Sequence, residues 1–248
     1  IKAKYYEKGI LELYSKEDIQ IISEGTFKLT KEGIELLAMD PASVAMVIFK
    51  LLSSAFAEYH IDEEKTISLN IENFVQIMRR AKPNDQITLE LDVENNKLKI
   101  SMKGESKKLF TLPLLELSDA PKKIPNLEFP GAIEIDANLI KETIKDAALV
   151  GDCVIFSVDS DKFSLSSKGD NNEMNMTLSK DSPSITLSIP ESVKAKYSIE
   201  YLDKLTKASK LAEKVRIQFK TDYPLRFDYI ALDKVQLSFI LAPRVDTE

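Results

Sequence analysis

The residue types that most often carry chemistry are scarce in this chain of 248 residues. It has a single histidine, His60, and a single cysteine, Cys153. A structural zinc site needs about four thiolate or imidazole ligands, so one of each cannot form it. His60 would also have to serve any serine or cysteine nucleophile, yet no nucleophile motif adjoins it in residues 57–62. We expect His60 to be a partly exposed linker residue and Cys153 to be a small buried hydrophobic side chain.

The sequence also gives little evidence for a nucleotide-binding site or a metal site. The chain has only 7 glycines, and no two are spaced for a dinucleotide-binding or P-loop motif. Carboxylates are plentiful, with 40 Asp and Glu, so a Mg²⁺ site built from carboxylates alone stays an alternative. Its nearest candidate is Asp159 with Asp161, but these residues lie between two alternating segments and favour a hairpin turn. We therefore predict no catalytic residue, no metal ion and no cofactor.

The composition is that of an ordinary globular protein. Apolar residues make up 44% and charged residues 30% of the chain, whose length allows one large domain or two of about 120 residues. The longest nearly apolar run, residues 42–49, is far shorter than the ~20 residues that span a bilayer. Residues 1–7 contain no hydrophobic run, so we expect no signal peptide. A single cysteine favours a reducing interior.

Alternating apolar and polar residues predict strands along most of the chain. The clearest are residues 26–29, 34–39, 86–91, 97–102, 154–158, 163–167, 174–178, 215–219 and 236–241. Turn residues at 31–33, 94–96 and 159–161 separate neighbouring segments by only a few positions. Such short connections predict antiparallel hairpins.

Four stretches have helical periodicity instead: residues 10–23, 71–82, 137–149 and 199–214. The second and fourth align when the chain is shifted so that Ile71 falls on Ile199, and Phe74 then falls on Leu202. We call this shift the repeat offset. Each half of the chain then has the order helix, strands, helix, strands. Residues 114–130, with three prolines and little periodicity, are the natural connector. We predict an α+β chain made of two tandem domains of one fold.

The last three helices place cations opposite their apolar stripes. The stripes are Phe74, Ile77, Met78 and Ala81; Leu139, Ile140, Ile144 and Ala147; and Leu202, Leu205, Ser209 and Ala212. The outward cations are Arg79 and Arg80; Lys141 and Lys145; and Lys207, Lys210 and Lys214. The first helix differs, because its acidic residues outnumber Lys16, the one cation that is well placed on its outward side.

Two interpretations of these cations stay open. Lysine and arginine on polar helix faces usually serve solubility alone. The chain, however, has a formal net charge of −6, so cations gathered on three helices contrast with an acidic whole. Such a surface attracts a polyanion locally while the rest of the protein repels it, which favours nucleic-acid binding.

Four short strings carry a resemblance to a known family. They are residues 37–44 (LAMDPASV), 149–152 (LVGD), 201–208 (YL followed by TKA) and 241–245 (LAPRV). With the order of elements, they resemble the sliding clamp family, the proliferating cell nuclear antigen type of archaea and eukaryotes. The Met-Asp element and the terminal Leu-Ala-Pro-basic element form a fairly specific pair at this separation. The resemblance extends from about residue 3 to the end.

The resemblance implies two copies of a DNA-clamp domain, at residues 1–115 and 132–248, joined by a connector at residues 116–131. Three chains would close into a ring whose helices line a central channel around double-stranded DNA, with antiparallel sheets outside. The ring would carry no catalytic residue and would act as a processivity factor. It would tether DNA polymerase, clamp loader, nuclease and ligase through short aromatic peptide motifs, with no membrane partner.

The resemblance also implies site residues, position by position. DNA would be contacted, without reading its sequence, by Lys16, Arg79, Arg80, Lys82, Lys141, Lys145, Lys207 and Lys210. A partner-peptide pocket would be formed by Met39, Ser43, Val44, Met46, Ile124, Pro125, Pro224, Ile240, Ala242 and Pro243. Plain core packing is the alternative for Val44 and Met46. Subunits would meet through two sheet edges that carry Lys107, Phe110 and Leu112, and Met174, Met176 and Leu178.

Two other functions stay open as alternatives. One is a specialised subunit of a hetero-oligomeric or checkpoint-type clamp, in place of a ring of identical chains. The other, from a different class, is a carboxylate-based metal-dependent hydrolase that uses Asp159 and Asp161. The location expected for a clamp follows the source: the cytoplasm, in association with the nucleoid, if archaeal, and the nucleus if eukaryotic.

Overall fold

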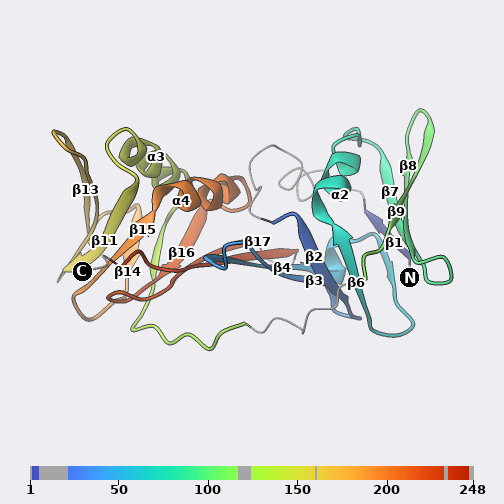
Figure 1. Cartoon of the computed structure of the whole chain (residues 1–248), viewed down its shortest axis with the longest axis horizontal. Coiled ribbons are helices and arrows are strands. Elements are labelled where there is room, and N and C mark those ends of the chain that lie inside the picture. Colours follow the sequence, from blue (N-terminus) through green and yellow to red (C-terminus); the bar gives the residue numbers. More distant parts are fainter. Residues whose placement is uncertain (1, 6–21, 117–123, 160, 232–233, 246–248) are drawn as a thin grey trace. The chain divides into compact units, whose positions relative to one another are not determined.

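The computed structural model of the chain describes residues 2–5, 22–116, 124–159, 161–231 and 234–245 (Figure 1). Two compact units are present, which we call unit 1 and unit 2. Unit 1 contains residues 1–41, 47–124 and 231–237, and unit 2 contains residues 42–46, 125–230 and 238–248. The helix predicted at residues 10–23 lies outside the described residues up to position 21, and so does Lys16. The domain boundaries after residues 115 and 131 stay predictions.

Short strands and three described helices make up both halves of the chain. The first half contains β1 (Lys2–Tyr5), β2 (Glu24–Leu29), β3 (Gly33–Met39), β4 (Ala45–Leu52), η1 (Ser53–Ala55), β5 (Glu58–His60), β6 (Lys65–Asn70), α2 (Ile71–Met78), β7 (Gln86–Asp92), β8 (Lys97–Lys103) and β9 (Lys107–Pro113). The second half contains β10 (Ile133–Asp136), α3 (Ala137–Ala148), β11 (Cys153–Asp159), β12 (Lys162–Lys168), β13 (Glu173–Ser179), β14 (Ile185–Leu187), β15 (Val193–Ser198), α4 (Ile199–Thr206), η2 (Lys207–Lys210), β16 (Lys214–Gln218), β17 (Leu225–Ala231) and β18 (Val235–Leu241).

The two halves repeat one topology. At the repeat offset, the bounds of β6, α2, β8 and β9 coincide with those of β15, α4, β17 and β18. Five strands are ordered β5-β1-β7-β8-β9 in the first half and β14-β10-β16-β17-β18 in the second. Four more are ordered β4-β3-β2-β6 and β13-β12-β11-β15. The predicted α+β fold, duplicated in tandem, is confirmed.

β4 and β18 are neighbours in the strand order. The Leu52 amide donates to the Lys234 carbonyl oxygen (2.9 Å), and the Ala242 amide donates to the Val44 carbonyl oxygen (2.9 Å). Each of these hydrogen bonds lies within one unit. The two bonds give the same pairing offset within their own units, because the step from Val44 to Leu52 equals the step from Lys234 to Ala242.

The predicted turns do connect antiparallel strands. At residues 31–33 the chain reverses between β2 and β3, and Gly33 has a φ of 149°. A Cβ atom there would lie 2.1 Å from the Leu51 carbonyl oxygen, so only glycine permits this close approach. The turn at residues 94–96 joins β7 to β8 and places Asn96 at a φ of 52°. Asp159 lies opposite Lys162, which confirms the hairpin between β11 and β12.

Side-chain caps fix where two helices begin. Asn70 Oδ1 accepts a hydrogen bond from the Asn73 amide (2.8 Å), and Asp136 Oδ1 accepts one from the Leu139 amide (2.8 Å). Each cap satisfies an N–H group that the first helical turn leaves free. α3 packs against α4 and the strands beneath it, as Figure 1 shows. Its fully buried apolar residues are Ala137, Ile140, Ile144 and Ala147.

Two helices end earlier than the sequence pattern predicts. α2 stops at Met78, and residues 79–85 form the loop into β7. α4 stops at Thr206 and continues as the tighter turn η2, and Lys214 already begins β16. The predicted helix ends at residues 82 and 214 are therefore wrong. Pairing explains the second case, because Lys214 lies opposite Asp136 of β10 and is held in the sheet.

Candidate functional site

The end of α2 presents three exposed cations, Arg79, Arg80 and Lys82. Lys82 Nζ lies 2.8 Å from Glu105 Oε2, in the turn between β8 and β9. Arg79 and Arg80 form no ion pair with any described residue. Their exposure agrees with the outward face predicted for this helix, and it leaves two uncompensated positive charges at one end of unit 1.

In unit 2 the predicted cations lie on α3 and η2. Lys145 and Lys210 are exposed, whereas Lys141 and Lys207 are half-buried. The hydrogen bond with Glu142 (2.9 Å) raises the pKa of Lys145, and the charge of Asp203 on α4 adds to this shift. Lys207 Nζ lies 3.4 Å from the same Asp203. Lys145 and Lys207 thus approach one carboxylate from two elements.

Carboxylates on the same helices offset part of this positive charge, which the helix faces alone did not indicate. Besides Glu142 and Asp203, Glu200 pairs with Lys204 at 2.8 Å. These partners are three or four positions apart, the spacing that brings side chains together on a helix. The ion pairs could therefore have been predicted from the sequence. Exposed pairs of this kind are weak, and a competing anion can replace the carboxylate.

Three further lysines, outside the residues predicted to contact DNA, lie on the β8–β9 hairpin, and one of them, Lys107, is a predicted subunit-edge residue. Lys103 and Lys107 are directly opposite each other in the register. Lys108 Nζ donates to the Arg80 carbonyl oxygen at 3.5 Å, which brings the hairpin to the end of α2. The only sequence signal is the density of lysines in residues 97–108, because the contact itself depends on long-range pairing.

The residues predicted to bind partner peptides differ in exposure. Ser43 is exposed and has a φ of 58°. The Val44 carbonyl accepts its hydrogen bond from Ala242, so these two residues are in contact within unit 2. Met46 and Ile240 are only 5% and 7% exposed, and the Met46 side chain is therefore packed as core. The remaining members are half-buried or exposed: Met39, Ile124, Pro125, Pro224 and Pro243.

Arg244 fastens the segment after β18 to the edge strand β15. Its amide donates to the Lys196 carbonyl oxygen (2.7 Å), and its Nη1 donates to Asp152 Oδ2 (2.7 Å). Nη1 also lies 3.1 Å from Cys153 Sγ. The Arg244 hydrogen bond lowers the pKa of Asp152, while burial raises the pKa of Cys153. Cys153 is only half-buried and touches a cation, which corrects the prediction of a buried hydrophobic residue.

The two edges predicted to join subunits are the ends of strand orders. β9 ends the first five-stranded order, and β13 ends the four-stranded order of the second half. Both alternate along their length between exposed and more buried positions. On β13, Met174, Met176 and Leu178 are half-buried; on β9, Lys107 is exposed, Phe110 is half-buried and Leu112 is buried.

The residues considered for catalysis have structural partners. His60 is exposed in β5, with Nε2 2.9 Å from Asp62 Oδ1. Asp161 Oδ1 lies 2.6 Å from Lys180 Nζ, and Asp159 accepts a hydrogen bond from Ser192. Among the described residues, no three His, Cys, Asp or Glu side chains are grouped to hold a metal ion. No helix in the described part of the chain is long and apolar enough to span a bilayer.

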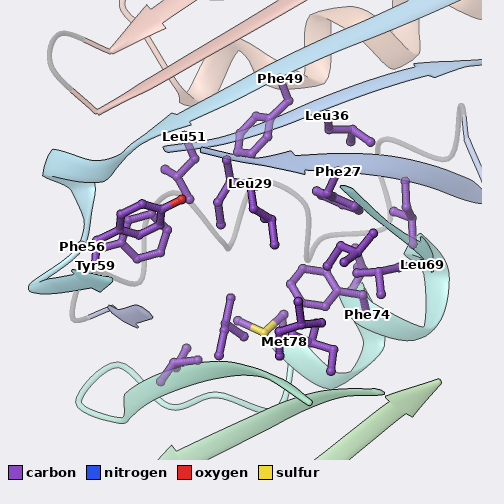
Figure 2. Close-up of a pocket in the computed structure, with 18 residues that line it drawn as sticks. Phe27, Leu29, Leu36, Phe49, Leu51, Phe56, Tyr59, Leu69, Phe74 and Met78 are labelled. Atoms are coloured by element: carbon purple, nitrogen blue, oxygen red, sulfur yellow. The ribbon is translucent and has the colours of Figure 1, made fainter. Parts of the chain in front are cut away.

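Unit 1 contains an apolar cavity of about 90 Å³. Figure 2 shows the side chains that line it. Its walls come from α2 and from strands of both sheets of the first half, with Phe27, Phe49 and Phe74 among them. The one hydroxyl in the lining, that of Tyr59, donates to the carbonyl oxygens of Thr30 (2.7 Å) and Gly33 (2.9 Å). Without a convergent polar group to orient a ligand, we interpret the cavity as part of the hydrophobic core.

Comparisons with known proteins cover nearly the whole chain. Family models of proliferating cell nuclear antigen match its N-terminal domain at residues 3–120 and its C-terminal domain at residues 123–244. A DNA polymerase sliding clamp of Nanoarchaeum equitans is 40% identical over 229 residues, 91% of this chain and 92% of that protein. Another, from Thermococcus gammatolerans, is 35% identical over 227 residues, 91% of each.

The fold comparison agrees with the sequence comparison. The crystal structure of PCNA from Thermococcus kodakaraensis superposes with a TM-score of 0.87 at 25% identity and covers 98% of this chain and 99% of that one. Both domain models, in the same order, thus coincide with the two halves that the repeat offset defines. The chain therefore belongs to the proliferating cell nuclear antigen family.

Proposed function

We propose that this protein is a DNA sliding clamp, a ring that encircles duplex DNA and holds a polymerase on its template. The observation that carries the proposal is the duplicated clamp fold, matched by the family models over both halves of the chain. Relatives at 40% and 35% identity are named as DNA polymerase sliding clamps. A clamp acts as a tether, so we propose no catalytic residue and no cofactor.

Two of the free strand edges, those of β9 and β13, give the ring its means of closure. β9 and β13 are different surfaces of one chain, and a contact between unlike surfaces repeats head to tail until it closes. Three copies would bring together six copies of the repeat. An unpaired strand edge that stays exposed promotes aggregation. The unpaired edges of β9 and β13 therefore support the proposal that each pairs with a strand of another subunit.

The pairing of β4 with β18 supplies the register of this contact. By the repeat offset, β13 corresponds to β4 and β9 corresponds to β18. We transfer the pairing of Leu52 with Lys234 and of Val44 with Ala242 from β4 and β18 to β13 and β9. The transferred register places Met174 opposite Leu112, Met176 opposite Phe110 and Leu178 opposite Lys108. The half-buried residues of β13 would then meet the more buried face of β9. Apolar side chains would thus cover each other at the junction.

Lysine and arginine side chains give a clamp a way to hold DNA without stopping on any sequence. We propose that Arg79, Lys145 and Lys207 contact phosphates, with Arg80, Lys82, Lys141 and Lys210 beside them. Phosphate contacts orient a protein on the duplex but carry no sequence information. The ion pairs of Lys145 and Lys207 support exchange, because a phosphate can take the place of an exposed carboxylate.

Partner enzymes would bind a pocket beside the Val44–Ala242 contact. A short peptide with aromatic anchors needs an apolar surface for its side chains and exposed backbone for strand-like pairing. Val44, Ala242 and Pro243 supply half-buried apolar surface. Polymerase, clamp loader, nuclease and ligase are the partners we propose. Such a clamp acts where the DNA is, in the cytoplasm of an archaeal cell or the nucleus of a eukaryotic one.

Light scattering on the purified protein, followed by a polymerase assay, tests the proposal. A homotrimeric clamp gives one species at three times the 28.0 kDa of the chain, and it lengthens the products that a DNA polymerase makes in a single binding event. A stable species near 28.0 kDa would instead favour the hetero-oligomeric subunit. A trimer without any effect on product length would contradict the clamp function.

A further inference from the structure

A cationic surface that the helices do not explain lies on the β8–β9 hairpin of unit 1. We propose that this hairpin is a DNA-backbone site of its own, in which Lys103 and Lys107 share one phosphate of the duplex beside the end of α2. The inference rests on the proposed clamp function. It adds a contact, from a strand turn rather than from a helix.

The hairpin is held firmly against the end of α2. Lys82 Nζ pairs with Glu105 Oε2 at 2.8 Å, and Lys108 Nζ donates to the Arg80 carbonyl oxygen at 3.5 Å. Gly104 packs so closely that a Cβ atom there would lie 2.0 Å from Asp85 Oδ1. Figure 1 shows the turn between β8 and β9 on the same side of unit 1 as the end of α2. Hairpin and helix end therefore adjoin: the Lys108 side chain faces α2, whereas Lys103 and Lys107 lie on the opposite face of the strand pair, beside the turn.

Positive charge dominates this surface. It gathers the cations Arg79, Arg80, Lys82, Lys103, Lys107 and Lys108. Two carboxylates face them, Asp85, which is 9% exposed, and Glu105, which already pairs with Lys82. Net positive charge thus remains here in a chain whose formal net charge is −6. A local surplus of this kind attracts a polyanion.

Lys103 and Lys107 are the natural point of contact. They lie directly opposite each other in the β8–β9 register, and both side chains are exposed. Like charges at directly opposite positions destabilise a strand pair. A phosphate between the two ammonium groups would attract both of them. Binding would thus relieve the repulsion between Lys103 and Lys107 that destabilises the free protein.

The fold itself does not require these lysines. At the repeat offset, Lys103, Lys107 and Lys108 correspond to Ala231, Val235 and Gln236 on the second-half strands β17 and β18. The basic hairpin is therefore a feature of the first half alone. It continues the exposed cations of Arg79 and Arg80, which favours the same ligand, a DNA backbone, over a separate acidic partner.

Salt dependence separates a phosphate contact from a general charge effect. We would compare Lys103→Gln with Lys97→Gln, which removes an exposed lysine from the other end of the same strand. Binding of the assembled protein to a labelled duplex is followed by fluorescence anisotropy between 50 and 200 mM salt. Losing a whole phosphate contact lowers the log–log slope by about 0.9. Because Lys107 still faces the shared phosphate in Lys103→Gln, we expect its slope to fall by at most this amount, and its affinity to decrease up to about three-fold less than that of the unaltered protein between 50 and 200 mM salt.

The controls keep the two proposals apart. Lys103 lies on β8 and not on the edge strand β9, so light scattering is expected to show an unchanged ring. Lys97→Gln is expected to keep the slope of the unaltered protein. Equal slopes for Lys103→Gln and Lys97→Gln would overturn the hairpin site and leave the clamp intact. An unaltered protein that neither closes into a ring nor binds the duplex would overturn the clamp function instead.

Discussion

Tyr197 and Tyr229 in unit 2 are both fully buried, but their hydroxyl groups differ in hydrogen bonding. The Tyr197 hydroxyl donates to the Tyr223 carbonyl oxygen (2.7 Å), whereas the Tyr229 hydroxyl is buried without a hydrogen-bond partner among the described residues. Both rings are 0% exposed. Leaving a buried polar group unpaired costs about 1–3 kcal/mol. Removing the hydroxyl oxygen should therefore change the free energy of unfolding in opposite directions at the two positions.

We predict that Tyr229→Phe raises the free energy of unfolding by about 1 kcal/mol and that Tyr197→Phe lowers it by about 1 kcal/mol. The first change removes an unpaired oxygen, and the second removes a satisfied hydrogen bond while leaving the Tyr223 carbonyl without its donor. Chemical denaturation of both variants measures the difference. A loss of stability in Tyr229→Phe would show that its hydroxyl has a partner after all.

Alkaline pH is predicted to weaken unit 1 through Tyr59. Burial raises the pKa of its hydroxyl from 10.0 to about 12, so the folded state holds this proton more tightly than the unfolded state. Its contribution to stability is complete below pH 10 and is lost as the pH rises toward about 12. Denaturation at pH 9 and pH 11 should therefore show a smaller drop in Tyr59→Phe than in the unaltered protein. Equal drops would contradict this.

At the residue scale, local patterns predicted exposure but not long-range contacts. The outward position of Arg79, Arg80 and Lys145 follows from helical periodicity, and the structure agrees. The contacts of Arg244 with Asp152, 92 residues away, do not follow from any local pattern. For the same reason Cys153 was expected in the core: its apolar neighbours were visible in the sequence, while the guanidinium that reaches its sulfur was not.

Among the elements, alternation predicted nine strands but did not identify every strand that alternates, since β10 and β15 were missed although exposed and buried positions alternate along them. All nine expected strand segments are strands, within one or two residues at their ends. β4 was missed because seven of its eight positions are apolar and nearly all are buried, so it has no polar face to alternate with. β5 and β14 are three residues long, too short for any period. The helix starts were clearer than the ends, since Asn70 and Asp136 are capping residues.

The proposed register between β9 and β13 predicts one specific cross-link. It places Leu109 opposite Thr177 at a site without direct backbone hydrogen bonds, where opposite Cα atoms lie about 4.5 Å apart and a disulfide can form. In a Cys153→Ser background, we expect Leu109→Cys with Thr177→Cys to yield covalent oligomers on oxidation. Non-reducing electrophoresis measures their fraction.

A register control accompanies this cross-link. Leu109→Cys with Ser179→Cys places the thiols on the same face but diagonally, where Cα atoms are about 7–8 Å apart and bridging requires backbone movement. We expect little covalent product from this pair. A diagonal pair that cross-links as well as the opposite pair would contradict the register, and monomers from both pairs would contradict pairing of these edges.

For the whole molecule, duplication was visible in the sequence because it preserves spacing better than residue identity. The repeat offset, found on a few apolar positions, coincides with the bounds of α2 and α4 and of three strand pairs. Closure into a ring was not readable in this way, because it depends on which strands end a sheet. The family resemblance named the edges now seen as β9 and β13, which are two of the sheet ends in the described structure, and their contact between subunits stays a proposal.

Reversing two charges in unit 2 tests how the ring would hold DNA. We predict that Lys145→Glu with Lys207→Glu shortens retention on circular DNA severalfold and reduces polymerase processivity, because two phosphate contacts per chain become repulsive. Thermal stability should change little, since both lysines form only weak ion pairs. Lys162→Glu with Lys168→Glu, exposed on β12, changes the net charge equally and serves as the control. Equal retention by both variants would contradict the assignment.

Partner recognition is predicted to depend on open space at Val44. Val44→Trp would fill the apolar surface beside Ala242, so a peptide with aromatic anchors should bind at least ten-fold more weakly while the ring persists. Val93→Trp is the matched control, because Val93 is 62% exposed in the β7–β8 turn and has room for the larger ring. Fluorescence polarisation of a labelled peptide measures affinity, and light scattering measures assembly. An intact trimer of Val44→Trp that binds the peptide with unchanged affinity would place the pocket elsewhere, since no peptide can share that space with an indole.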